Sequence, residues 1–157
     1  MLQQFTNLIF SMLMAVTGDQ SSNINIEKVQ DTACLSQAIY QEAGNQSMAG
    51  KLAVGNVINN RTKSDYYPDT MCAVIKQKGQ FSFWKNVHRI KESDPAVMKQ
   101  MEDSVKAALL VVNGETRDNT NGATAFVNLK IATHKEWLRN MKFTAKIGEH
   151  HFYKNLH

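Results

Sequence analysis

Glu42 is the residue of this sequence whose surroundings best suit acid–base chemistry. Leu35, Ala38 and Ile39 stand seven, four and three residues before it, and at about 3.6 residues per turn these positions share one face of a helix. A carboxyl group at the edge of an apolar face is poorly hydrated when charged, which raises its pKa and keeps it protonated near neutral pH. Such a group can act as a general acid. The alternative is a glutamate in the last helical turn whose side chain bends towards water.

Other patterns that would indicate catalysis or cofactor binding are missing from the sequence. It has no G-x-S-x-G nucleophile motif and no glycine-rich phosphate loop. His150 and His151 are adjacent, so on a strand they would point to opposite faces and could not readily share one metal ion. We therefore expect no metal site and no cofactor. Further acidic residues occupy positions typical of turns and helix caps: Asp65, Asp69, Glu92, Asp94, Glu115 and Asp118.

Two helices are expected to position Glu42. The first runs from about Glu27 to Ala43 and is stopped by Gly44-Asn45. Ser47 is a suitable N-cap for the second, Met48 to about Thr62, whose apolar residues cover more than half of its circumference. The second helix should therefore be central and buried. The pair forms a hairpin, and Glu42 would lie beside its junction.

The rest of the chain predicts an α+β fold, mostly helical with a small antiparallel sheet. A turn at Tyr66–Asp69 precedes a short helix that ends near Ile75, and Asp94-Pro95 begins a long helix that ends at Asn113-Gly114. The remaining elements are three strands, with a short helix between the first and second: Gly122–Asn128, His134–Leu138, Lys142–Ile147 and His150–Tyr153.

A loop between these helices combines aromatic and basic residues. Phe81, Phe83 and Trp84 are flanked by several lysines and Arg89. Such a mixture can stack nucleobases or line a sugar-binding cleft. The alternative is a packed loop with solvated lysines.

Composition limits the class of protein. A length of 157 residues fits one domain with a real core, and the net charge of +4 with a pI of about 9.1 favours negatively charged partners such as nucleic acid, anionic lipid or acidic wall polymer. Cys34 and Cys72 could be two buried thiols or one bridge.

The N-terminal segment, residues 1–26, is an apolar stretch followed by a polar linker. Its run Leu8–Val16 is too short to span a bilayer and matches the apolar region of a signal peptide, but no Lys or Arg precedes it. Export by this segment and an amphipathic or buried helix both stay open.

Several motifs together resemble the spore-cortex-lytic (SleB-type) cell wall hydrolases. They occur in the same order between about Thr32 and Tyr153: Ala38–Gly44, Gly50–Arg61, Tyr67–Cys72, Gln80–Ser82, Gly122–Thr124 with Phe126 and Asn128, and Ile147–Phe152.

The resemblance implies a lysozyme-like, lytic-transglycosylase-type catalytic domain over residues 27–157 that cuts the glycan strand of peptidoglycan. It implies that Glu42 is the catalytic acid and that Cys34 pairs with Cys72. Gln80, Phe81, Phe126 and Asn128 are the residues expected to position the sugar. The chain departs from the family at Gln46, where a second glutamate is usual, and at Leu129, where proline is common.

With one well-placed acid, we expect lytic transglycosylase chemistry, in which the muramoyl 6-hydroxyl replaces water as nucleophile. If water is used instead, Asp65 and Asp69 are the first residues to consider as a base.

The rival interpretations are a muramidase, or a basic nucleic-acid-binding or virion structural protein. We expect a monomer that acts on peptidoglycan at the bacterial cell wall or periplasm, without binding nucleic acid or inserting stably into a membrane. A compact basic hydrolase would suit phage lysis, as an endolysin released from the host cytosol, or a secreted role in wall remodelling.

Overall fold

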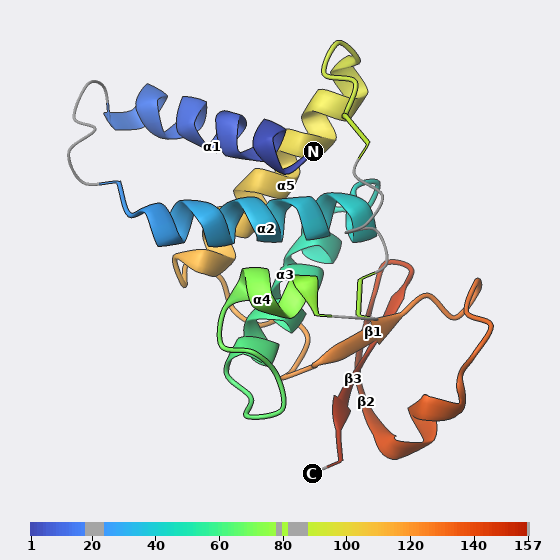
Figure 1. Ribbon diagram of the computed structural model, residues 1–157. Coiled ribbons are helices and arrows are strands. Elements are labelled where there is room, and N and C mark those ends of the chain that lie inside the picture. The colour runs from blue at the N-terminus through green and yellow to red at the C-terminus, as the bar shows by residue number, and fades with distance from the viewer. Residues whose placement is uncertain (18–23, 78–79, 82–87, 157) are drawn as a thin grey trace.

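In the part of the chain that the structure describes, a layer of five α-helices packs against a small antiparallel sheet (Figure 1). The computed structural model describes residues 1–17, 24–77, 80–81 and 88–156. Of the predicted aromatic loop, residues 82–87 lie outside this part of the chain. Among the described residues, no helix is both long and apolar enough to cross a membrane. The α+β architecture predicted from the sequence is confirmed.

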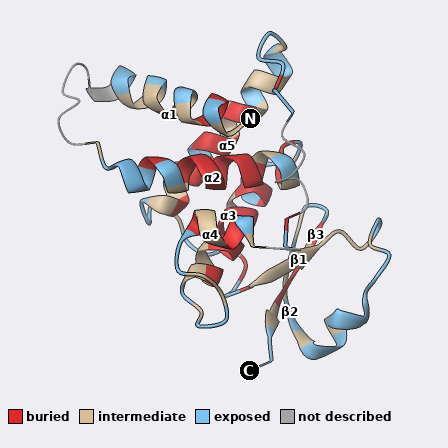
Figure 2. Ribbon diagram, viewed as in Figure 1, coloured by how far each residue is buried: buried red, intermediate tan, exposed pale blue. Residues whose placement is uncertain are grey.

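Helix α2 is the centre of the helical layer. It spans Ile26–Ala43 and packs against the four other helices: α1 (Leu2–Thr17), α3 (Met48–Thr62), α4 (Met71–Lys76) and α5 (Pro95–Val112). Figure 2 shows buried residues along most of its length. Glu42 is therefore carried on the helix that packs against all the other described α-helices.

Local capping residues define where the helices begin. Ser47 accepts a hydrogen bond from the backbone N–H of Gly50, and Asp94 accepts from those of Ala96 and Val97. Both caps are those predicted from the sequence, and α3 has the predicted bounds. Proline follows Asp94 as the first residue of α5, where its missing N–H costs nothing.

The N-terminal segment is helical as far as the structure describes it. Phe5 and Ile9 of α1 are fully buried and form a core cluster with Val29, Ala33 and residues of α5. Helix α1 thus adds apolar contacts to α2 and α5, as expected of a buried N-terminal helix.

The sheet has strand order β1-β3-β2, with β1 at Ala125–Val127, β2 at Met141–Ile147 and β3 at His150–Asn155. Phe152 of β3 packs on Ala53 and Val57 of α3, which joins the sheet to the helices. Strand β1 is shorter than predicted because the turn before it takes up its backbone donors. The N–H of Gly122 bonds to Asp118, and that of Ala123 bonds to Thr120.

The short helix before β2 lies later than predicted. It is a 3₁₀ helix, η3, at Glu136–Asn140 rather than at His134–Leu138. The indole N–H of Trp137 bonds to the backbone oxygen of His134, so the segment before η3 is held by a side chain instead of a helical turn.

Candidate active site

Glu42 lies in the last turn of α2, beside the junction with α3. Gly44 caps α2 in a right-handed conformation, with φ −57° and ψ −35°. A Cβ at this position would press on the backbone oxygen of Tyr40, so the glycine is needed for space rather than for a left-handed turn. The tight junction keeps Glu42 at the start of a sharp change in chain direction.

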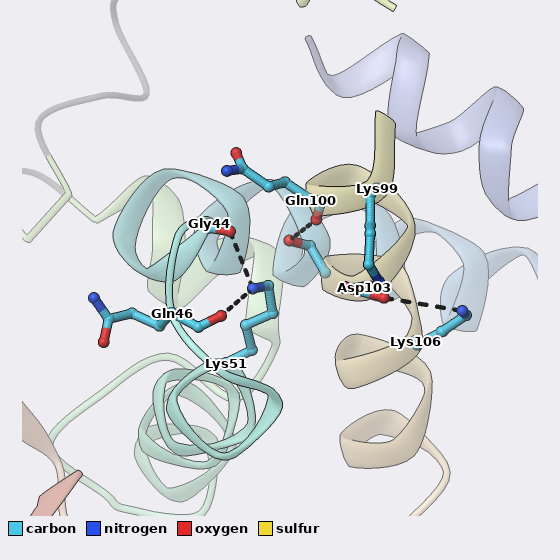
Figure 3. A network of polar contacts seen from close by, with 8 residues as sticks. Gly44, Gln46, Lys51, Lys99, Gln100, Asp103 and Lys106 are labelled. Atoms are coloured by element: carbon cyan, nitrogen blue, oxygen red, sulfur yellow. Dashed lines mark hydrogen bonds and ion pairs between the residues drawn. The ribbon is translucent and has the colours of Figure 1, made fainter. Parts of the chain in front are cut away.

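Lys51 holds this junction from inside the protein. Its side chain is buried, and Nζ donates hydrogen bonds to the backbone oxygens of Gly44 at 3.0 Å and Gln46 at 2.5 Å (Figure 3). The first bond satisfies the C-cap carbonyl of α2, and the second holds the turn that follows. Burial lowers the pKa of Lys51, and the carboxylate of Asp103 opposes that change.

The carboxyl group of Glu42 is mostly removed from water. Burial raises its pKa, and the positive charge of Arg61 lowers it in part. The net effect keeps the group protonated to a higher pH than an ordinary glutamate. The environment inferred from its helical face in the sequence is the one that the structure has.

Arg61 also acts on Glu42, and it was not predicted from the sequence as a site residue. It is buried, with Nε donating to the backbone oxygen of Thr124 at 2.6 Å and Nη1 donating to Gln80 at 3.1 Å. Its guanidinium also lies 5.0 Å from the ring centroid of Tyr67 and 5.6 Å from that of Phe81. The signal that could have found it is a lone arginine near the end of an otherwise buried helix.

Two clefts adjoin this centre. A cleft of about 530 Å³, here called the Glu42 cleft, is lined by the end of α2 and by the sheet, including Phe126 and Asn128. A second cleft of about 400 Å³ is lined by Arg61, Gln80, Phe126 and neighbouring residues. Phe126 lines both clefts.

The predicted sugar-positioning residues therefore fall in different places. Phe126 and Asn128 line the Glu42 cleft, and Gln80 lines the second cleft with Arg61. Phe81 is buried, and the Arg61 guanidinium lies over its ring. Asp65 and Asp69 are exposed, and neither lines either of these clefts.

A second carboxylate, Glu149, lines the Glu42 cleft and was not predicted as a site residue. It sits in the β2–β3 turn, and Gln46 donates a hydrogen bond from Nε2 to its Oε2 at 3.2 Å. A turn residue this far along the chain carries no local pattern that points to Glu42. Only its place within the last of the resembling motifs could have drawn attention to it.

His150 completes the sheet side of the cleft. It is buried against Phe126, with ring centroids 5.1 Å apart, and burial lowers its pKa. Among the described residues, no group of three or more His, Cys, Asp or Glu side chains is arranged to hold a metal ion.

The structure joins Cys34 of α2 to Cys72 of α4 in a disulfide. The bond lies on the helical layer that carries Glu42, and it ties the short α4 to the central helix.

Comparisons with a family model, with curated relatives and with solved structures agree with one another. The family model described as Cell Wall Hydrolase matches residues 45–153, a span that begins just after Glu42. Spore cortex-lytic enzymes are similar: that of Halalkalibacterium halodurans is 29% identical over 143 residues, covering 85% of this chain and 40% of the relative. That of Bacillus cereus is 30% identical over 124 residues, covering 79% and 44%. The chain thus spans about two fifths of the length of these relatives.

Two solved structures share the fold over almost their whole length. The catalytic domain of the germination-specific lytic transglycosylase SleB from Bacillus anthracis has a TM-score of 0.65 at 27% identity, covering 85% of this chain and 98% of that one. The catalytic domain of the Bacillus cereus SleB protein has a TM-score of 0.64 at 26% identity, covering 87% and 99%.

Proposed function

Because this chain belongs to the cell wall hydrolase family, we propose that it degrades peptidoglycan by cleaving the β-1,4 bond between N-acetylmuramic acid and N-acetylglucosamine. The observation that carries the proposal is the Glu42 carboxyl group, buried enough to have a raised pKa yet lining an open cleft on a lytic-transglycosylase-type fold. The same activity would serve wall remodelling or phage lysis.

In this proposal Glu42 acts twice. As an acid, it protonates the glycosidic oxygen, and as a carboxylate it then accepts the proton of the muramoyl 6-hydroxyl. That hydroxyl attacks the anomeric carbon, so the bond to the leaving sugar breaks and a 1,6-anhydro bond forms. No water is consumed. The raised pKa of Glu42 supports the first step, because the group must start protonated.

Glu149 favours a second candidate, a water-using muramidase on the same substrate. Glycosidases that use water normally have two carboxylates flanking the bond, and Glu149 lines the same cleft as Glu42. A nucleic-acid-binding or virion structural protein has less support, since the described residues that line the Glu42 cleft include a second acidic side chain and no Lys or Arg.

The test replaces Glu42 by glutamine, which keeps the shape of the side chain and cannot donate the proton. We expect purified sacculi to be cleared about 100- to 10,000-fold more slowly than by the wild type, because general acid–base catalysis contributes rate factors of that order. Glu115→Gln is the matched control, since Glu115 is exposed and lies outside the cleft.

Clearing by Glu42→Gln near the wild-type rate would remove Glu42 from the mechanism. Absence of clearing by the wild-type protein itself, with retention on DNA, would favour the nucleic-acid alternative.

A further inference from the structure

The Glu42 cleft has two walls from distant parts of the chain. Glu42 in the last turn of α2 and Gln46 in the α2–α3 turn form one wall. The other wall comes from the sheet and its connections: Asn128 after β1, Glu149 in the β2–β3 turn and His150 of β3. Glu149 and the general acid thus line the same cleft from different parts of the chain. Its side chain is exposed, so it is open to a bound ligand.

Gln46 holds Glu149 by a reciprocal pair of hydrogen bonds. Its Nε2 donates to Glu149 Oε2 at 3.2 Å, and its Oε1 accepts from the backbone N–H of Glu149 at 3.4 Å. Gly148 has φ 58°, and the Gln46 side chain fills the space where a Cβ would stand. The turn therefore fits Gln46 closely, and a larger residue at position 148 would disturb both.

Gln46 is itself fixed in place by Lys51. Figure 3 shows its backbone oxygen facing Lys51 while its side-chain amide extends the other way. The polar contacts run from the buried lysine through Gln46 to Glu149. The carboxylate is consequently positioned before any substrate arrives.

Glu149 keeps free capacity to accept hydrogen bonds. An ionised carboxylate offers about four acceptor sites, and Gln46 uses one. In the part of the chain that the structure describes, no basic side chain forms an ion pair with Glu149. An unpaired carboxylate on a cleft wall suits a ligand rich in O–H and N–H donors, because hydrogen bonds to a charged acceptor are stronger than those to a neutral one.

We propose that Glu149 is a substrate-positioning residue of the Glu42 cleft, which accepts hydrogen bonds from the hydroxyl and N-acetyl N–H groups of the sugar next to the cleaved bond. Gln46 orients it for this role. The proposal rests on the proposed function, because it concerns how the same cleft binds the same glycan.

The experiment measures steady-state kinetics on short soluble peptidoglycan glycan strands of defined length. Glu149→Gln should raise KM about tenfold, as expected for loss of one hydrogen bond to a charged group. It should leave kcat within about twofold, with the same products and the same pH profile, since the proton is carried by Glu42. Gln46→Glu should also raise KM, because it places a second negative charge beside Glu149. Glu115→Gln is the control and should match the wild type.

A second measurement makes the result independent of turnover. The binding of the same strands is measured calorimetrically in a Glu42→Gln background, with and without Glu149→Gln, where we expect a Kd about tenfold weaker for the double variant. Equal KM and equal Kd would overturn the proposal.

Two other outcomes separate this proposal from the proposed function. If wild-type products carry reducible ends and Glu149→Gln abolishes kcat, then Glu149 is a general base and the positioning role is wrong. If the wild type cuts no strand, the proposed function fails, and the calorimetric comparison still decides whether Glu149 binds the glycan.

Discussion

At the scale of single residues, the site depends on two opposite effects on Glu42. Burial raises the pKa of its carboxyl group, and the guanidinium of Arg61 lowers it. Arg61 is held by Thr124, Gln80 and two aromatic rings. Burial is the larger of the two effects on Glu42. The pKa of Glu42 therefore stays above the ordinary glutamate value, although a positive charge acts on the group.

The raised pKa of Glu42 predicts a pH-dependent cost in stability. Below the ordinary glutamate pKa the group is protonated in both folded and unfolded states. As pH rises from there through the raised folded pKa, the unfolded state gives up its proton more readily than the folded state does. The free energy of unfolding of the wild type therefore falls over this range. Glu42→Gln carries no such penalty. We therefore expect the variant to be the more stable protein at neutral pH.

Urea unfolding of both proteins from about pH 4 to about pH 8 tests this expectation. The difference in unfolding free energy should be smallest at the acidic end and should grow with pH. A difference that is constant across the range would show that burial does not govern the titration of Glu42. Glu115→Gln should show no comparable trend, because Glu115 is exposed.

Residues that local patterns describe could be predicted from the sequence, and residues that long-range packing brings together could not. The poorly hydrated environment of Glu42 could be predicted because Ala38 and Ile39 lie on its own helix. Arg61 and Glu149 reach the site only through contacts across the fold, to Thr124 and Gln46 respectively. No periodicity within a helix or strand encodes such pairs.

At the scale of elements, the same distinction holds. Helices α3 and α5 have capping residues in the sequence, and their starts were predicted correctly. The segment 134–140 has no such cap, and its 3₁₀ helix begins later than predicted because a Trp137 hydrogen bond fixes the chain before it. The N-terminal helix depended on tertiary contacts of Phe5 and Ile9, so its apolar run alone left two interpretations open.

The disulfide between α2 and α4 leads to an element-scale prediction. Cys34 and Cys72 are 38 residues apart, and the chain-entropy model for a loop of this length gives a stabilisation of about 3–4 kcal/mol. Reduction, or Cys34→Ser with Cys72→Ser, should lower the free energy of unfolding by roughly that amount. Because α4 packs on α2 also through Val74 and Ile75, we expect the fold to survive.

Chemical denaturation with and without reductant measures the loss. Intact-mass analysis after alkylation under denaturing conditions serves as the control for the bond itself. Two alkylated thiols in the unreduced protein would contradict the pairing.

At the scale of the whole molecule, the excess of positive charge predicts how the protein meets its substrate. The chain carries 18 Lys and Arg residues against 14 Asp and Glu residues, whereas the described residues that line the Glu42 cleft include two glutamates and no Lys or Arg. Long-range attraction to an acidic wall must therefore come from exposed surface outside the cleft, and salt screens such attraction. Pelleting with sacculi should weaken between about 0.05 M and about 0.5 M salt. Unchanged pelleting would exclude the basic surface as the anchor.

The last prediction concerns the products, which depend on the whole site acting on the whole substrate. The muramoyl 6-hydroxyl belongs to the sugar that is being cleaved, so its attack is intramolecular and has a large advantage in effective concentration over water. Glu149 is the carboxylate that could activate water, but Gln46 holds it by its side chain and its backbone. We therefore expect 1,6-anhydro-muramoyl ends, which are lighter than hydrolysis products by one water and resist borohydride reduction.

Mass spectrometry of digested sacculi, with and without borohydride, measures these ends directly. A muramidase that uses water provides the reference digest, since all of its muramoyl ends are reducible. If the protein yields only reducible ends, then water reaches the anomeric carbon, and Glu149, which lines the same cleft, is the first residue to test as the base. In that case Glu149→Gln should abolish cleavage as completely as Glu42→Gln. If the ends are anhydro, Glu149→Gln should leave them so, because the proton then passes through Glu42 alone.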